Sequence, residues 1–224
     1  MKATHTMNIW DKKHLTKMIK DSSYLSIYNT SNKILYKMFE DYPENRVKEH
    51  IVAKALILGR TYAAAIERRK SKDGLSNDDF YIQKVTKCFI STKMGKDIKK
   101  IRSASEELQR ASMSLSLHGK LQDSFKPDTK LNKRSFCSKY LHFQLPDDFY
   151  LYDTRAANAL SRFRKHLPQM KQHLSKFPPY QDNWDKTYWS FYRGCYCLSQ
   201  TIANVLKKNL SKREIDSLLL TVSK

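Results

Sequence analysis

The sequence is poor in residues that break helices, with only 5 glycines and 6 prolines among its 224 residues. Sandwiches and barrels need frequent turns, so this scarcity argues against them and favours helices. No run approaches the roughly eighteen consecutive apolar residues that a membrane span requires, and residues 1–10 lack the apolar core of a signal peptide. We therefore expect a cytoplasmic protein with no membrane partner.

Cysteine is also scarce. The four cysteines are Cys88, Cys137, Cys195 and Cys197, which is too few for a disulfide framework in a chain of this size. The last two are one residue apart, and neither a CxxC pair nor a histidine cluster accompanies them. The sequence therefore predicts no zinc site, no iron–sulfur site and no cofactor.

Acidic residues are the third deficit, because 22 Asp and Glu face 42 Lys and Arg and leave a net charge of +20. Residues 84–139 carry a surplus of +9 and residues 154–213 a surplus of +10. A charge of this size repels itself in a compact fold and is typical of proteins that bind polyanions. We expect nucleic acid as the partner, ahead of an anionic membrane; a generically basic surface is the alternative.

The chain is rich in helical periodicity, and 40% of its residues are hydrophobic. Apolar side chains recur every three or four residues through most of it. Helices are predicted over 47–69, 78–90, 98–117, 133–143, from Asp153 or Thr154 through Phe163, over 184–206, and from Ser211, where Glu214 completes a capping box. A polar loop is predicted from the end of the third helix through Pro127. The expectation is one all-α domain, residues 1–224, present as a monomer.

One stretch combines a basic helix with an acidic residue that follows it. Lys133-Arg134-Ser135-Phe136-Cys137-Ser138-Lys139 opens the helix, and Phe149-Tyr150-Leu151-Tyr152-Asp153-Thr154-Arg155 leads into the next one. This arrangement resembles the helix-hairpin-helix DNA glycosylase superfamily, as a divergent member similar to the 8-oxoguanine and adenine glycosylases. In that superfamily an aspartate at a helix N-terminus follows the hairpin helix by eighteen to twenty residues.

The resemblance implies roles for particular residues. Ser135 aligns with the position where lysine gives a lyase and a non-nucleophilic residue gives a monofunctional enzyme, and Asp153 lies 18 residues later. Asp153 would be the catalytic carboxylate. Lys133, Arg134, Ser135, Lys139 and Arg155 would contact DNA at or near the hairpin.

A second similarity lies upstream, where Leu56-Ile57-Leu58-Gly59-Arg60-Thr61-Tyr62-Ala63-Ala64-Ala65 resembles the early helix of the family. That helix carries a Leu-x-Gln-Gln-Thr stretch, and Gly59-Arg60 stands here in place of the two glutamines. The resemblance covers residues 47–165 and leaves the aromatic C-terminal helices, 166–224, unassigned. Arg60 is the candidate wedge for the space left by a flipped base. Tyr62, Trp189 and Tyr192 are candidates for the pocket that holds the base, together with Trp184.

The resemblance implies a chemistry that needs one carboxylate. Breaking an N-glycosidic bond builds positive charge on the sugar, which an ionised aspartate stabilises while it orients or deprotonates a water. The nucleotide must first leave the base stack. The expected activity is excision of a damaged or modified base from double-stranded DNA, which leaves an abasic site. The divergent sequence also suggests modified phage DNA as a substrate, in antiviral defence.

The sequence departs from the family at the hairpin, where Leu131-Asn132-Lys133 replaces Gly-x-Gly. Several alternatives stay open. Asp153 could be a helix cap alone, and Lys139, one turn after Ser135, could instead be a Schiff-base nucleophile or a solvated lysine. The protein could be a non-catalytic DNA-binding relative located at the nucleoid, or a basic helical module that binds RNA or protein. His142 is expected to be a packed histidine.

Overall fold

The computed structural model describes residues 12–23, 29–67, 74–129, 132–165 and 170–222, and these ranges contain helices but no strand. The predicted all-α class is confirmed. Within these ranges lie twelve α-helices and one π-helix: α1 (Lys12–Ser23), α2 (Asn29–Asp41), α3 (Lys48–Thr61), α4 (Asn77–Asp79), η2 (Phe80–Val85), α5 (Thr86–Thr92), α6 (Met94–Ser103), α7 (Glu107–Thr129), α8 (Arg134–Gln144), α9 (Thr154–Lys165), α10 (Met170–Leu174), α11 (Lys186–Leu206) and α12 (Lys212–Val222).

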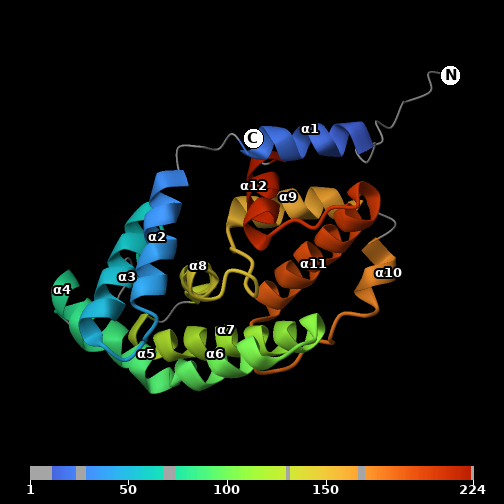
Figure 1. Cartoon of the computed structure of the whole chain (residues 1–224). Coiled ribbons are helices and arrows are strands. Elements are labelled where there is room, and N and C mark those ends of the chain that lie inside the picture. The colour runs from blue at the N-terminus through green and yellow to red at the C-terminus, as the bar shows by residue number, and fades with distance from the viewer. Residues whose placement is uncertain (1–11, 24–28, 68–73, 130–131, 166–169, 223–224) are drawn as a thin grey trace.

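Helix α8 lies in the middle of the molecule, where Figure 1 shows it end-on. Helices α2 and α3 lie on one side of it, α6 and α7 run below it, and α9, α11 and α12 lie on the other side (Figure 1). Every residue from Phe136 to Gln144 is buried. The basic helix predicted over 133–143 is therefore the centre of the core, and only its first turn reaches the surface.

Helix α3 ends earlier than predicted. It stops at Thr61 rather than Arg69, because Ala63 adopts a left-handed conformation with φ of 49° and the amide of Ala64 donates to the carbonyl of Gly59. The chain then folds back over Gly59, where a Cβ would lie 3.2 Å from the Cα of Ala65. A left-handed alanine has no sequence signal, since glycine or asparagine usually takes that position.

The helix predicted over 98–117 is two helices, and the predicted polar loop does not exist. Helix α6 ends at Ser103, and α7 begins at Glu107 and continues through Pro127 to Thr129. The guanidinium of Arg110 donates to the carbonyls of Ala104 and Ser105, at 3.1 and 2.9 Å. A side chain from the next helix therefore stabilises the break between the two helices.

The C-terminal helix begins as predicted. The amide of Glu214 donates to Ser211 Oγ, and the amide of Ser211 donates to Glu214 Oε2 at 2.8 Å, which confirms the capping box. Helix α12 packs against α1 and α9 (Figure 1). Across the described ranges, no helix is both long enough and apolar enough to cross a lipid bilayer.

Candidate functional site

The chain between α8 and α9 has no regular structure, yet much of it is buried. Residues Asp148, Phe149, Tyr150 and Leu151 are buried, and Tyr152 is half-buried. Buried backbone without helical hydrogen bonds needs other partners. Side chains from α8 and α11 supply them, and we call residues 148–152 the anchored segment.

Helix α8 supplies three of these partners. Ser138 Oγ accepts from the amide of Tyr152 at 2.9 Å, and Lys139 Nζ donates to the carbonyl of Tyr152 at 2.7 Å. His142 Nδ1 donates to the carbonyl of Phe149 at 2.8 Å, while its Nε2 accepts from the hydroxyl of Tyr36 at 2.7 Å. Burial lowers the pKa of His142 to about 3, so the ring is neutral. The expectation of a packed histidine is confirmed.

Helix α11 supplies two more partners. The hydroxyl of Tyr192 donates to the carbonyl of Asp148, and the hydroxyl of Tyr188 donates to the carbonyl of Tyr150, both at 2.8 Å. Both tyrosines are buried, with Tyr192 only 2% exposed. Four of the five carbonyls in the anchored segment therefore accept from a named side chain, and the backbone that leads to Asp153 is held in place.

Asp153 caps α9, as one reading of the sequence predicted. Its Oδ1 accepts from the amide of Arg155 at 2.8 Å and lies 3.4 Å from the guanidinium of the same residue. Its side chain is 28% exposed. Its second oxygen, Oδ2, has no hydrogen bond to a described residue. One oxygen thus holds the helix terminus, while the other makes no hydrogen bond within the described residues.

Lys139 lies beside Asp153 and is only 3% exposed. Its ammonium donates to Ser135 Oγ at 2.6 Å as well as to Tyr152, and it lies 5.9 Å from the centre of the Tyr62 ring. Burial lowers the pKa of Lys139, and the negative charge of Asp153 opposes that shift. Residues from α3, α8 and α9 that are far apart in the sequence therefore meet around one buried amine.

Helix α12 adds two charged residues that sequence reasoning missed. Arg213 donates to Asp216 Oδ2 at 2.9 Å, and its guanidinium lies 5.8 Å from the centre of the Tyr62 ring. Asp216 is buried, which raises its pKa to about 6 against the opposing charges of Arg213 and Lys139. The capping box signals only where this helix starts, and nothing local indicates that the helix packs beside Asp153.

A cavity of about 390 Å³ is lined by Tyr152, the residue before Asp153, and by Phe191, Arg164 and Lys186, among others; Asp153 itself is not one of its lining residues. The rings of Tyr152 and Phe191 meet edge to face at 5.2 Å. A volume of this size falls within the usual range for small-ligand pockets. Aromatic walls and two cations suit a planar, electron-rich group attached to a phosphate.

Four of the five predicted DNA contacts have side chains that are engaged within the protein. Arg134 pairs with the buried Asp185 at 2.7 Å, Lys133 Nζ donates to the carbonyl of Ile66 at 2.9 Å, and Lys139 is buried. Ser135 is half-buried and accepts from Lys139. Arg155, with a side chain that is 73% exposed, is the most exposed of the five, and its guanidinium lies 3.4 Å from Asp153. The hairpin turn itself is incompletely seen, because residues 130–131 lie outside the described ranges.

The predicted wedge and pocket residues are scattered. Arg60 is exposed at the end of α3, as a wedge would need to be. Tyr62 is half-buried in the site, and its hydroxyl donates to Asn32 at 2.6 Å. Trp189 donates to the carbonyl of Pro178 at 3.1 Å, and Tyr192 is buried in the core, and neither lines the cavity that Tyr152 borders. Tyr152 and Phe191 take that position instead.

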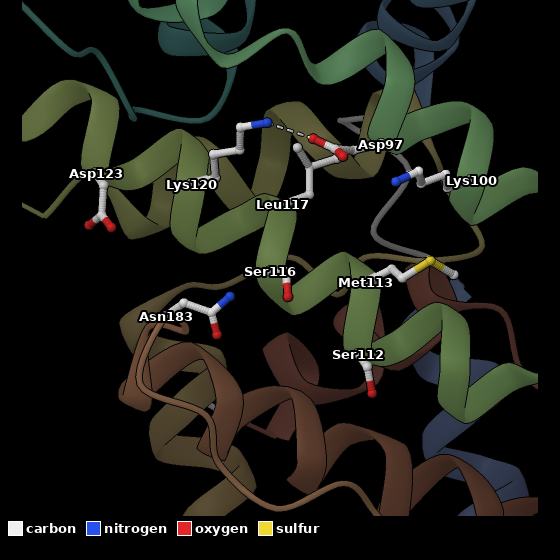
Figure 2. A pocket seen from close by; sticks show the side chains of 9 residues that line it. All are labelled: Asp97, Lys100, Ser112, Met113, Ser116, Leu117, Lys120, Asp123 and Asn183. Carbon is white, nitrogen blue, oxygen red and sulfur yellow. Dashed lines mark hydrogen bonds and ion pairs between the residues drawn. The ribbon is translucent and has the colours of Figure 1, made fainter.

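Another cavity, of about 610 Å³, lies between α6, α7 and Asn183. Figure 2 shows Lys120 and Asp97 joined across it, at 2.8 Å, with Lys100 nearby. Two lysines and two aspartates line it, so its charges balance.

Within the ranges that the structure describes, no three or more His, Cys, Asp or Glu side chains are grouped to hold a metal ion. Comparison of the chain with family models, with curated proteins and with solved structures finds no match in any of the three.

Proposed function

We propose that this protein is a DNA glycosylase that excises a damaged or modified base by water attack, with Asp153 as the catalytic carboxylate. The observation that supports this proposal most is that the two carboxylate oxygens of Asp153 have different surroundings. Its Oδ1 caps α9, its Oδ2 has no hydrogen bond to a described residue, and the preceding residue, Tyr152, forms part of the wall of a cavity. A residue that served only as a cap would not need such a neighbour.

The reaction would proceed on a nucleotide turned out of the duplex. The base would enter the cavity against Tyr152 and Phe191, with its sugar near Asp153. As the N-glycosidic bond breaks, its electron pair leaves with the base, which takes up a proton. The carboxylate stabilises the positive charge on the sugar. A water oxygen then bonds to C1′ and gives its proton to Asp153 or to solvent.

Lys139 and Ser138 would act as positioning residues in this scheme. They hold the carbonyl and the amide of Tyr152, the residue before Asp153. Lys139 as a Schiff-base nucleophile is the rival role, and its lowered pKa favours it. Its burial and its two hydrogen bonds oppose that role, because the amine would have to leave both partners to reach a sugar.

The decisive experiment compares the wild type with Asp153→Asn on a panel of DNA duplexes. The panel contains uracil, 8-oxoguanine, mispaired adenine, alkylated bases and hypermodified phage DNA. Asparagine caps helices as well as aspartate does, so this variant removes the charge and keeps the fold. We expect abasic product from the wild type only, with strand breaks only after alkali.

Other outcomes identify the rival functions. Breaks without alkali, together with a covalent adduct trapped by borohydride and lost in Lys139→Met, would make Lys139 the nucleophile. If neither protein forms abasic product on any duplex, and both bind DNA equally with an affinity that falls with salt, the protein is a non-catalytic DNA-binding protein. Stronger binding to single-stranded RNA than to duplex DNA would favour an RNA-binding module. Activity on ordinary lesions alone would remove the case for phage defence.

A further inference from the structure

A second region differs from the Asp153 site because most of its charged side chains have no carboxylate partner among the described residues. A cavity of about 670 Å³ opens between α6 and the loop that joins α2 to α3. We call it the α6 groove. Five cationic residues line it, Arg46, Lys93, Lys96, Lys99 and Arg102, while Glu44 is its one carboxylate. Glu44 is already held by Arg46 in a two-pronged pair at 2.8 and 2.9 Å.

The other four cations have no carboxylate partner among the described residues, and all four are exposed. Lys96, Lys99 and Arg102 follow one another at steps of three residues on α6, about 4.5 Å of rise each. Lys93, in a left-handed conformation between α5 and α6, lies at the positive end of the α6 dipole. Unpaired charges of one sign that crowd together repel each other, so the groove is suited to an anion with many charges.

The wall of the groove is held rigidly. Lys54, fully buried on α3, donates to the carbonyls of Tyr42 and Glu44 and to Asn45 Oδ1, at 2.9 to 3.0 Å. Gln144, at the end of α8, donates to the carbonyl of Pro43 and accepts from Asn45. A buried cation and a buried amide thus fix a surface loop in one position, and a preorganised wall loses little entropy on binding.

The partner that fits is a phosphodiester backbone rather than a lipid surface. A helix that lies in a membrane interface inserts apolar side chains. Those of α6, Met94, Ile98 and Ile101, are all buried in the core. The neighbouring cavity of Figure 2 provides a contrast, because its two lysines are balanced by two aspartates. Positive charge is left unpaired on the groove side of α6.

We propose that the α6 groove binds the phosphate backbone of duplex DNA and is the main backbone contact of this protein. The inference rests on the proposed function only for the identity of the partner. Helix α8 joins the two regions, with Ser135 at the candidate site and Gln144 at the groove. The nine helical steps from one to the other span about 14 Å. That is less than half of a helical turn of B-form DNA, roughly 34 Å, so one duplex is long enough to contact both.

The test measures how the DNA affinity of Lys96→Gln/Lys99→Gln/Arg102→Gln depends on salt. The matched control, Lys17→Gln/Lys33→Gln/Lys176→Gln, removes the same charge from three other exposed lysines. Both triple variants are made in the Asp153→Asn protein, so that no turnover intervenes. Fluorescence anisotropy of a labelled duplex is followed between roughly 50 and 200 mM salt. Thermal melting of each variant checks that it is folded.

Each phosphate contact contributes about 0.9 to the slope of log K against log salt. We expect the groove variant to lose up to about 2.7 from that slope, while the control keeps the slope of the parent. Equal losses in both variants, or no loss in the groove variant, would overturn the proposal. So would a groove variant that loses binding to single-stranded RNA or to phosphatidylglycerol vesicles but not to duplex DNA. This experiment measures DNA binding alone. Its result does not depend on whether the protein excises bases, so the groove proposal and the proposed function can fail separately.

Discussion

The Asp153 site and the α6 groove differ in whether their polar groups have partners within the protein. In the site, nearly every polar atom has a partner inside the protein: the anchored segment is held by α8 and α11, and Asp216 is held by Arg213. In the groove, four cations have none among the described residues. Satisfied groups fix geometry, as chemistry at a single carboxylate requires. Unpaired surface charges offer attraction without precise geometry, which suffices for a backbone with one charge per nucleotide.

The largest expected effect is a loss of folding stability at low pH, and it comes from buried histidines rather than from the α6 groove. Burial lowers the pKa of His142 to about 3 and that of His118 to about 4, from 6.5. The unfolded chain therefore binds protons first as the pH falls below about 6.5, and the folded protein loses stability. The slope is at most about 1.4 kcal/mol per pH unit for each histidine. Asp216, whose pKa is raised to about 6, opposes this loss because the folded state takes up its proton first.

Urea unfolding between pH 7 and pH 4 measures this effect. His142→Asn keeps a donor toward the carbonyl of Phe149 and removes the titration, so its stability should fall less steeply than that of the wild type. Parallel curves for the two proteins would mean that His142 is not held neutral by the fold.

The wall of the groove depends on Lys54, so its removal tests whether a surface charge site needs a rigid support. Lys54→Met removes the donor from the carbonyls of Tyr42 and Glu44, while Asn45 Oδ1 keeps the hydroxyl of Tyr140 as a donor. We expect a loss of about 2 kcal/mol in the free energy of unfolding, faster hydrogen exchange at residues 44–46, and weaker DNA binding. Lys48→Met, an exposed change on the same helix, is the control and should leave all three unchanged. Full DNA affinity in Lys54→Met would show that the wall contributes nothing to binding.

The sequence could predict features that depend on neighbouring residues, and it could not predict contacts between distant ones. The start of α9 at Thr154, the cap at Asp153 and the capping box of α12 are local patterns, and the structure confirms them. The partners of the anchored segment are not local. Tyr192 lies 44 residues from the carbonyl that it holds. Lys139 was expected to contact DNA or solvent because lysine is rarely buried, and only the packed fold shows that it is enclosed.

The anchored segment itself can be loosened one hydroxyl at a time. Tyr192→Phe leaves the buried carbonyl of Asp148 without its donor at 2.8 Å. We expect a loss of about 1 to 3 kcal/mol in the free energy of unfolding, together with a fall in kcat for any excision activity, because Asp153 follows this backbone. Tyr196→Phe on the same helix is the matched control, since Tyr196 makes no hydrogen bond to a described residue through its hydroxyl. A stable but inactive Tyr192→Phe would show that the segment serves the site more than the fold.

The smallest expected change separates the two roles of Asp153. Asp153→Ala removes the acceptor for the amide of Arg155 and should cost about 1 kcal/mol of stability. Asp153→Asn keeps an acceptor and should unfold within a few tenths of a kcal/mol of the wild type. If the carboxylate acts on the sugar, both variants lose excision equally although only one loses stability. If Asp153 is a cap alone, activity follows stability and Asp153→Asn remains as active as the wild type. Because the two readouts respond to different oxygens of one side chain, measuring both on both variants tells the functions apart.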